Sequence, residues 1–236
     1  MKKIIATVTS VALASCLGFG LTACGNGSTS TKSDGNQQQA TEQNAADEDY
    51  ISTTEEGDEY ATGIHHATLK VEGYSPITIK LDANAAPVTV SNFCKLINEG
   101  YYNGLTFHRI VDEFCLQGGD PNANGTGGSG QAILGEFSAN GVANKLADNF
   151  KRGTLGMARN GQDMNSGEGQ FFITLSDTYA GSLNGNYAAF GSIDKAGMKT
   201  VDKIVSDYLK YADESQSGTI TKTSKQPKIK SMKMVD

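Results

Sequence analysis

Short runs of alternating apolar and polar residues dominate the chain after residue 64. Residues 68–71 and 77–81 alternate in this way, which predicts two strands buried on one face. The residues between them, Tyr74, Ser75 and Pro76, favour a turn, so the two strands are expected to form a hairpin. Further short runs predict strands at 107–111, 114–117, 155–158, 171–175, 188–193 and 229–235.

Two segments instead show the helical spacing of apolar residues. In residues 87–99, Pro87 suits the first helical turn and Gly100 follows as a stop signal. Residues 195–210 predict a second helix. Short strands separated by loops rich in Gly, Asn and Asp, with two isolated helices, predict a mainly β fold. We expect residues 64–236 to form a closed antiparallel barrel, because closure removes exposed strand edges.

The first 23 residues have the pattern of an export signal. Two lysines precede an uncharged, mostly apolar stretch, and small residues stand before Cys24. This arrangement resembles the bacterial lipoprotein signal, in which the cysteine is acylated and becomes the mature N-terminus. Cys16 has the same spacing, but apolar sequence continues past it and stops at Cys24, so lipidation is expected at Cys24. A transmembrane anchor is the alternative, because the stretch is about long enough to span a bilayer.

Residues 24–63 are expected to form the acylated cysteine and a disordered acidic tether. Between residues 25 and 63 there are nine acidic residues, one lysine and almost no large aliphatic side chain. Such a segment buries too little apolar surface to offset the entropy lost on ordering. A metal-sequestering acidic arm is the alternative interpretation.

The net charge of the chain belongs to this tether. The chain has 20 Lys+Arg and 26 Asp+Glu, whereas residues 64–236 carry 17 of each sign. Nucleic acid is not an expected partner, since phosphate recognition needs a basic patch. No metal site is expected: His65 and His66 are adjacent and would face opposite sides of a strand, and His108 stands alone. The G-x-G-x-x-G run at 125–130 lacks the flanking strand and helix of a dinucleotide site.

Several motifs in residues 64–235 resemble those of the cyclophilin-type peptidyl-prolyl isomerase family. They keep the order of the family: F-H-R-I-V at 107–111, F-C-L-Q-G-G-D at 114–120, G-E-F at 135–137, M-A-R at 157–159, Q-F-F-I at 170–173 and L-N-G-N-Y-A-A-F-G at 183–191. The resemblance implies an eight-stranded antiparallel barrel capped by two α-helices.

The residue types in these motifs suit rotation about an Xaa-Pro bond. The barrier to this rotation is about 18–20 kcal/mol. Twisting the amide removes its resonance and returns a lone pair to the proline nitrogen. A donor aimed at that nitrogen binds the twisted amide better than either planar form. Arg109 suits this role because its guanidinium stays protonated, and Gln117 could hold the guanidinium or bind the substrate carbonyl. The reaction needs no cofactor.

The resemblance implies a role for each matching residue. Arg109 and Gln117 match the catalytic positions. The residues at the positions that bind substrate are Phe114, Cys115, Ala158, Arg159, Gln170, Phe172, Leu183 and Tyr187. Cys115 replaces the usual methionine of the pocket, and Ser182 stands where many members have tryptophan. Tyr187 replaces a frequent histidine and can still donate a hydrogen bond.

The sequence therefore predicts a monomeric peptidyl-prolyl cis-trans isomerase that acts on proline-containing polypeptides. We expect it to be lipid-anchored on the extracytoplasmic face of the cell membrane and to assist the folding of exported proteins. A catalytically weak module that binds Pro-containing segments is the alternative left open by Cys115 and Ser182. A solute-binding lipoprotein would share the signal but not the strand pattern. Cys94 and Cys115 are expected to be free thiols.

Overall fold

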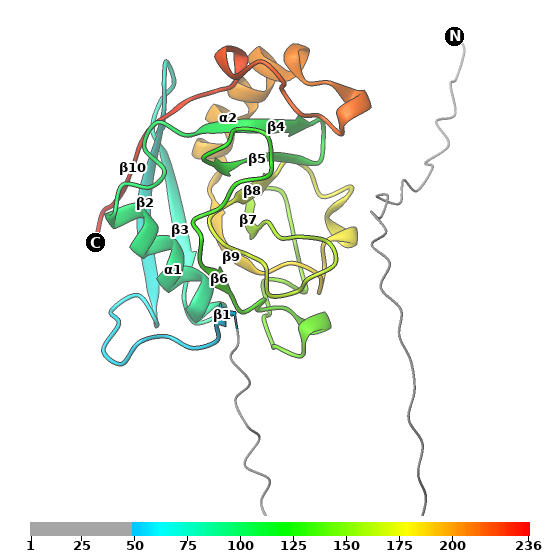
Figure 1. Ribbon diagram of the computed structural model, residues 1–236. Coiled ribbons are helices and arrows are strands. Elements are labelled where there is room, and N and C mark those ends of the chain that lie inside the picture. The colour runs from blue at the N-terminus through cyan, green and yellow to red at the C-terminus, as the bar shows by residue number, and fades with distance from the viewer. Residues whose placement is uncertain (1–48) are drawn as a thin grey trace, which may run out of the picture. The chain divides into compact units, whose positions relative to one another are not determined.

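The alternating runs of the sequence form an eight-stranded antiparallel sheet that curls into a barrel (Figure 1). This computed structural model describes residues 49–236, so the predicted signal and Cys24 lie outside the described residues. The strand order is β10-β2-β3-β9-β7-β8-β5-β4. The strands are β2 Ile64–Val71, β3 Ile77–Asp82, β4 Thr106–Val111, β5 Cys115–Asp120, β7 Thr154–Met157, β8 Phe171–Thr174, β9 Ala189–Ile193 and β10 Ile229–Met234. The predicted strands and the β2–β3 hairpin are thereby confirmed.

The barrel is nearly closed, and the prediction of full closure is wrong at one seam. Its end strands β4 and β10 are joined by an isolated bridge between Thr106 and Lys228 rather than by a ladder. Beside the bridge, the Phe107 N–H donates to the Pro227 carbonyl at 2.9 Å. Pro227 has no N–H to return. Backbone pairing resumes at Ile229, which accepts the Gly104 N–H at 2.9 Å and donates to the Leu105 carbonyl at 2.8 Å, and these are the last backbone hydrogen bonds across the seam within the described residues.

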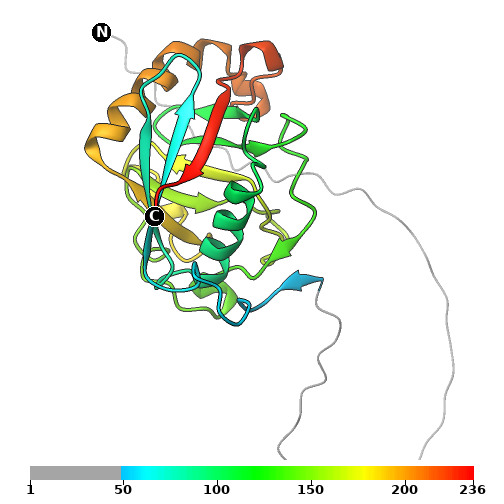
Figure 2. The same cartoon turned by 90° about the vertical axis from the view of Figure 1, so that its left-hand side faces the viewer.

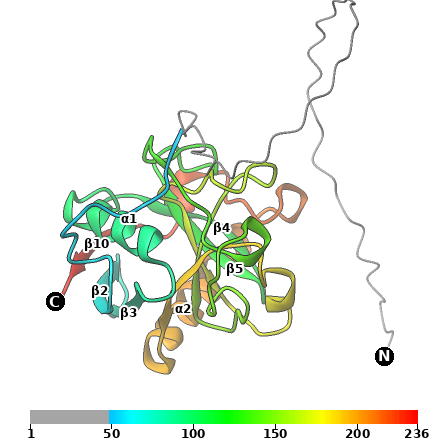
Figure 3. The same ribbon diagram turned by 90° about the horizontal axis from the view of Figure 1, so that it is seen from below.

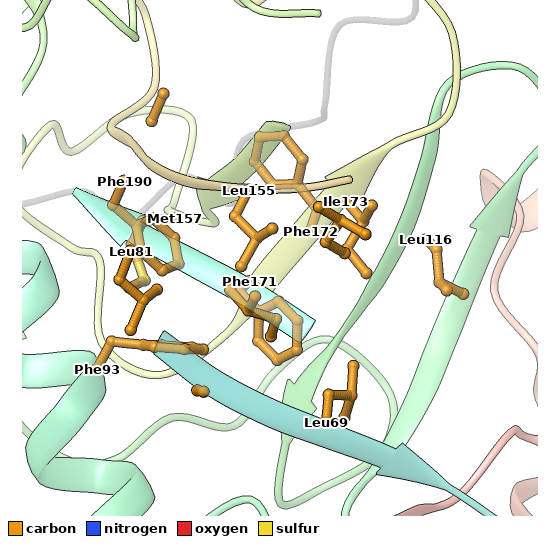
Figure 4. Close-up of a cluster of buried hydrophobic side chains, with 14 of the residues drawn as sticks. Leu69, Leu81, Phe93, Leu116, Leu155, Met157, Phe171, Phe172, Ile173 and Phe190 are labelled. Carbon is orange, nitrogen blue, oxygen red and sulfur yellow. The ribbon is translucent and has the colours of Figure 1, made fainter. Parts of the chain in front are cut away.

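Alternation along the strands sorts side chains to the two faces of the sheet. In β3, Ile77, Ile79 and Leu81 are buried and the residues between them are exposed. Figure 4 shows the resulting core, to which β2, β3, β5, β7, β8 and β9 contribute. Phe93 packs between Phe171 and Phe190, with ring centroids 5.5 and 4.9 Å away. Because consecutive residues of a strand face opposite sides of the sheet, Phe172 lies on the side opposite Phe171.

The two predicted helices are confirmed as α1 Pro87–Asn98 and α2 Lys195–Tyr208, which lie apart on the barrel (Figure 2). Ala86 cannot cap α1 with its side chain. Instead, the buried Glu136 carboxylate accepts the backbone N–H of Thr89 at 2.8 Å and its hydroxyl at 2.6 Å. Asp194 caps α2 by accepting the Gly197 N–H at 2.7 Å. No helix within residues 49–236 is long and apolar enough to cross a membrane.

The short elements lie outside the barrel sheet. β1 Tyr50–Ile51 pairs in parallel with β6 Ala132–Ile133. The 3₁₀ helices are η1 Ser138–Asn140, η2 Ala180–Ser182, η3 Leu209–Tyr211, η4 Glu214–Gln216 and η5 Thr223–Lys225.

Residues 49–63 form an arm along α1 (Figure 3). The sequence pattern instead predicts that these residues belong to the disordered tether, with the folded domain beginning at residue 64. The Ile51 carbonyl accepts the Leu134 N–H at 2.8 Å. Further along the arm, the Asp58 carboxylate accepts the hydroxyl of Ser91 on α1 at 2.5 Å, and Tyr60 packs against the core. The acidic composition of this stretch therefore does not keep its last 15 residues off the barrel.

Candidate active site

Arg109 has a fixed guanidinium on β4. Its register partner on β5 is Gln117, whose Oε1 accepts from Arg109 Nη1 at 3.1 Å. The same nitrogen donates to Cys115 Sγ at 3.1 Å, and Nε donates to the Ser217 carbonyl at 2.7 Å. The guanidinium carbon lies 5.8 Å from the centroid of the Phe114 ring. Within residues 49–236, Nη2 has no hydrogen-bond partner, so one edge of the guanidinium is left for another molecule.

The Ser217 carbonyl comes from a turn that the sequence did not predict to be part of the site. Ser217 has a left-handed φ of 56°, which points its carbonyl at Arg109. Asp213 organises the turn by accepting the N–H and the hydroxyl of Ser215 at 2.9 and 2.6 Å. The Ser215 hydroxyl contributes most to lowering the pKa of Asp213. A backbone carbonyl has no sequence signature, although Ser217-Gly218 does signal a turn.

A chain of amide groups continues from Gln117 away from Arg109. Gln117 Nε2 donates to Gln170 Oε1 at 3.0 Å. Gln170 Nε2 in turn donates to the carbonyls of Gly127 and Gly125 at 2.7 and 3.1 Å. The glycine-rich run at 125–130 is therefore a loop that orients Gln170.

Asp120 holds that loop in place. Its buried carboxylate accepts four backbone N–H groups, among them those of Asn122 at 2.8 Å and Gly127 at 2.9 Å. Burial raises the pKa of Asp120, but these hydrogen bonds outweigh it and the net shift is downward. The loop thus gains a charged acceptor that stays ionised at neutral pH.

The floor beside Arg109 is apolar. Phe172 and Leu183 are only 6% and 4% exposed, and Phe114 is half-buried. The Phe172 ring stacks on Phe150 and meets Tyr187 edge-on, with centroids 6.0 and 5.7 Å apart. On its barrel side Phe172 lies across Gly156, where any side chain would collide with the ring. These contacts fix the floor.

Cys115 lies two residues before Gln117 on β5 and faces the same side of the strand. Its side chain is buried beside Arg109, and Cys94 is also a buried free thiol. Burial raises the pKa of Cys115 to about 11, although the nearby guanidinium opposes the shift. At neutral pH the group is therefore a neutral thiol and a weak acceptor.

Arg159 and its neighbours form a polar hollow next to the floor. The Arg159 guanidinium lies 4.8 Å from the Tyr187 ring centroid, and its Nε donates to the Asn186 carbonyl at 2.9 Å. Ala158 is paired through its N–H with the Gln170 carbonyl at 2.9 Å. A cavity of about 440 Å³ opens here, and its lining includes Gln117, Ala158, Arg159, Glu168 and Gln170.

The family described as cyclophilin type peptidyl-prolyl cis-trans isomerase/CLD matches residues 66–234. The chain belongs to the cyclophilin family. An isomerase of Helicobacter pylori is 39% identical over 157 residues, which cover 66% of this chain and 90% of that relative. Peptidyl-prolyl cis-trans isomerase B of Bacillus subtilis is 42% identical over 123 residues, or 52% of this chain and 79% of that protein.

Solved cyclophilin structures share the fold. A crystal structure of a cyclophilin-type isomerase from Cryptosporidium parvum has a TM-score of 0.61 at 26% identity, covering 74% of this chain and 99% of that one. Another structure of that protein, in the presence of the dipeptide Ala-Pro, has a TM-score of 0.59 at 27% identity, with 72% and 99% covered. The family predicted from the motifs is thus confirmed, and the chain is an enzyme of the peptidyl-prolyl cis-trans isomerase class.

The cyclophilin fold links nine of the ten predicted site residues through contacts across β4, β5, β8 and the loops beside them, and the tenth, Leu183, is buried in the loop before Tyr187. Arg109, Cys115 and Gln117 are in direct contact. Phe172 and Tyr187 touch through their rings, and the remaining predicted residues lie along the same strands and loops. Within residues 49–236, no group of three or more His, Cys, Asp or Glu side chains is placed to hold a metal.

The three histidines of the chain are not among these predicted site residues. His65 Nε2 bonds to the Thr62 carbonyl at 2.8 Å, and His66 Nδ1 lies 3.2 Å from Asp236. His108 is buried beneath the loop at 120–130, and neither ring nitrogen has a partner among the described residues. Burial lowers the pKa of His108 to about 4, so its ring is neutral at pH 7. The buried imidazole behind the glycine-rich loop is therefore uncharged.

Proposed function

We propose that Arg109 catalyses rotation of Xaa-Pro bonds by binding the twisted amide, without covalent or metal chemistry. The observation that supports this role of Arg109 is that hydrogen bonds anchor its guanidinium. Three acceptors hold Nε and Nη1, and Nη2 stays free beside the apolar floor. A proline ring on Phe172 and Leu183 brings its nitrogen toward that free edge.

The energetics require only preferential binding. The proline nitrogen accepts a hydrogen bond well only after it has become pyramidal, so a fixed donor stabilises the transition state over both planar states. A preorganised donor in a site that excludes water is worth about 10²- to 10³-fold in rate. Arg109 needs little rearrangement, because its side chain is already held in the free protein.

The amide chain from Gln117 to Gln170 suits the substrate backbone. Peptides offer N–H and C=O groups whatever their side chains, and the groove beside Ala158 and Arg159 presents matching polar groups. We infer that residues before the proline lie along this stretch. The substrates are then proline-containing polypeptides rather than one defined sequence.

A protease-coupled peptide assay on the full chain tests the role of Arg109. Arg109→Ala should lower kcat by about 100-fold or more and leave peptide affinity largely unchanged. Lys203→Ala is the control, since Lys203 pairs with Asp207 at 3.1 Å on α2, away from the site, and should keep wild-type activity.

The same assay decides between catalysis and binding alone. If the wild type and Arg109→Ala show the same near-background rate while the peptide still binds, the chain is a Pro-peptide-binding module. That outcome would remove the catalytic proposal and leave the family assignment intact.

We also propose that the protein is lipid-anchored through Cys24 on the extracytoplasmic face of the membrane, as a monomer that assists the folding of exported proteins. The support is the sequence pattern of residues 1–24. Metabolic labelling with a radioactive fatty acid should mark the wild type and not Cys24→Ala. Label retained in Cys24→Ala would contradict this anchoring.

A further inference from the structure

Tyr179 is an aromatic residue at the rim of the site that the sequence did not predict to have a role. Its ring meets Phe114 edge-on, with centroids 6.4 Å apart and an interplanar angle of 84°. Tyr179 is 49% exposed, and among the large apolar residues of 49–236 only Val235 is more exposed. A ring left this open beside an apolar pocket has surface available for another side chain.

The backbone fixes where this ring stands. The Phe114 carbonyl accepts the Leu175 N–H at 3.0 Å, which ties the start of the 175–182 loop to the pocket. Ser182 then donates its N–H and its hydroxyl to the Tyr179 carbonyl, at 3.2 and 2.8 Å. Ser182 therefore holds the turn that carries Tyr179.

Tyr179 and Gln170 lie beside opposite ends of β5. On β5, Gln117 contacts Gln170, whereas Phe114 directly precedes the opposite end of the strand. In an extended strand three residues cover about 10 Å, so the two ends contact different parts of a bound peptide. Residues before the proline lie toward Gln170 under the proposed function, and the chain therefore leaves past Phe114.

We propose that Tyr179 is a specificity-determining residue, which together with Phe114 binds the side chain that follows the proline and favours an aromatic one. This inference rests on the proposed function, which gives the direction of the substrate. Edge-on and offset ring pairs form at centroid distances of about 4.5–7 Å, and a third ring can join such a pair. The tyrosine hydroxyl stays in water while its ring covers the ligand.

Two peptides that differ only after the proline test this selection. Isomerisation of Ala-Ala-Pro-Phe and Ala-Ala-Pro-Gly can be followed by NMR exchange without a coupling protease. The wild type should have a kcat/KM about 3- to 10-fold higher for the phenylalanine peptide. The difference should come from a lower KM rather than from a higher kcat. Tyr179→Ala should reduce the ratio toward one with kcat retained, and Tyr179→Phe should keep it.

The control is another exposed tyrosine. Tyr211 is 38% exposed and packs against Tyr208. Tyr211→Ala should leave the peptide preference unchanged. A preference that survives in Tyr179→Ala would overturn the inference, as would a loss that instead follows the residue before the proline.

A binding measurement separates this inference from the catalytic proposal. The chain has no tryptophan, so Tyr179→Trp introduces a single tryptophan at the rim, whose emission can be excited apart from that of the tyrosines. Adding Ala-Ala-Pro-Phe should shift its emission more than Ala-Ala-Pro-Gly does, and Tyr211→Trp should not respond. A response without turnover would refute catalysis and keep Tyr179 as a contact, whereas turnover without a response would refute the contact alone.

Discussion

The two ends of the candidate site are built differently. The polar end comprises Gln117, Gln170 and the loop at 120–130, and hydrogen bonds fix its groups to one another. The aromatic end comprises Phe114 and Tyr179, which touch through ring edges and stay partly exposed. A fixed polar end suits the peptide backbone, which all substrates share. An open aromatic end suits side chains, so selectivity can change there without disturbing the recognition of the backbone.

The largest expected effect concerns His108, which is buried near Gly125 in the loop of the polar end. His108 has a pKa of about 4 in the folded protein against an ordinary 6.5, because it is buried; Asp120 opposes the shift and Arg109 adds to it. Between these values the unfolded chain binds a proton that the folded chain does not. The free energy of unfolding should therefore fall by about 3 kcal/mol as the pH drops from 6.5 to 4, and this contribution should be constant below 4.

Urea unfolding of the wild type and of His108→Leu between pH 7.5 and 4 measures this contribution. Other groups titrate in both proteins, so the difference between the two curves isolates the imidazole. His108→Leu should show the shallower loss of stability. Parallel curves would mean that the His108 ring is solvated in the folded protein and that burial does not lower its pKa.

A smaller effect is expected when the amide chain is cut. Gln170→Leu keeps the size of the side chain but leaves Gln117 Nε2 and two glycine carbonyls without their partner. Unpaired polar groups cost about 1–3 kcal/mol each when buried and less when water reaches them, so kcat/KM should fall by about tenfold, mainly through KM. Steady-state assays with both proline peptides should show equal losses. An unequal loss would show that the polar end also selects side chains. Gln162→Leu, in an exposed loop, is the control.

The smallest expected effect concerns the thiol beside Arg109. Cys115→Ala removes one acceptor of Nη1, and Gln117 and Ser217 still hold the guanidinium. We expect kcat to fall by about threefold with little change in KM, consistent with the loss of one weak hydrogen bond. Cys115→Ser should recover most of the rate, since a hydroxyl also accepts the N–H. Cys94→Ala should not change kcat, and an equal effect of both substitutions would indicate a general packing defect.

The strands and helices could be predicted because each has its own pattern. Strict alternation located β3, and Pro87 with Gly100 framed α1. The open seam depends on Pro227 and on which residues of two distant segments pair, which the pattern of either strand alone does not contain. The arm at 49–63 was missed because its acidic average conceals Ile51 and Tyr60, which make the contacts.

The residues of the site also divide into those that the sequence predicted and those that it did not. Arg109, Gln117 and Phe172 lie in motifs, and their side chains form the centre of the site. Ser217 acts through its carbonyl, which is chemically the same for every residue type. Tyr179 gains its role from the fold of a loop around Ser182, and spacing along the chain does not report which way such a loop turns a ring.

The open seam places Arg109 on an end strand of the sheet. β4 has a full ladder only toward β5. Its other edge is joined by two isolated bridges, Thr106 with Lys228 and Arg109 with Thr219, and by backbone hydrogen bonds to residues 218–220 and 227. The turn around Ser217 borders the same edge and holds Arg109 Nε. Because the turn and the bridge to Thr219 both lie on this edge, we expect local opening of the edge to release the guanidinium as well.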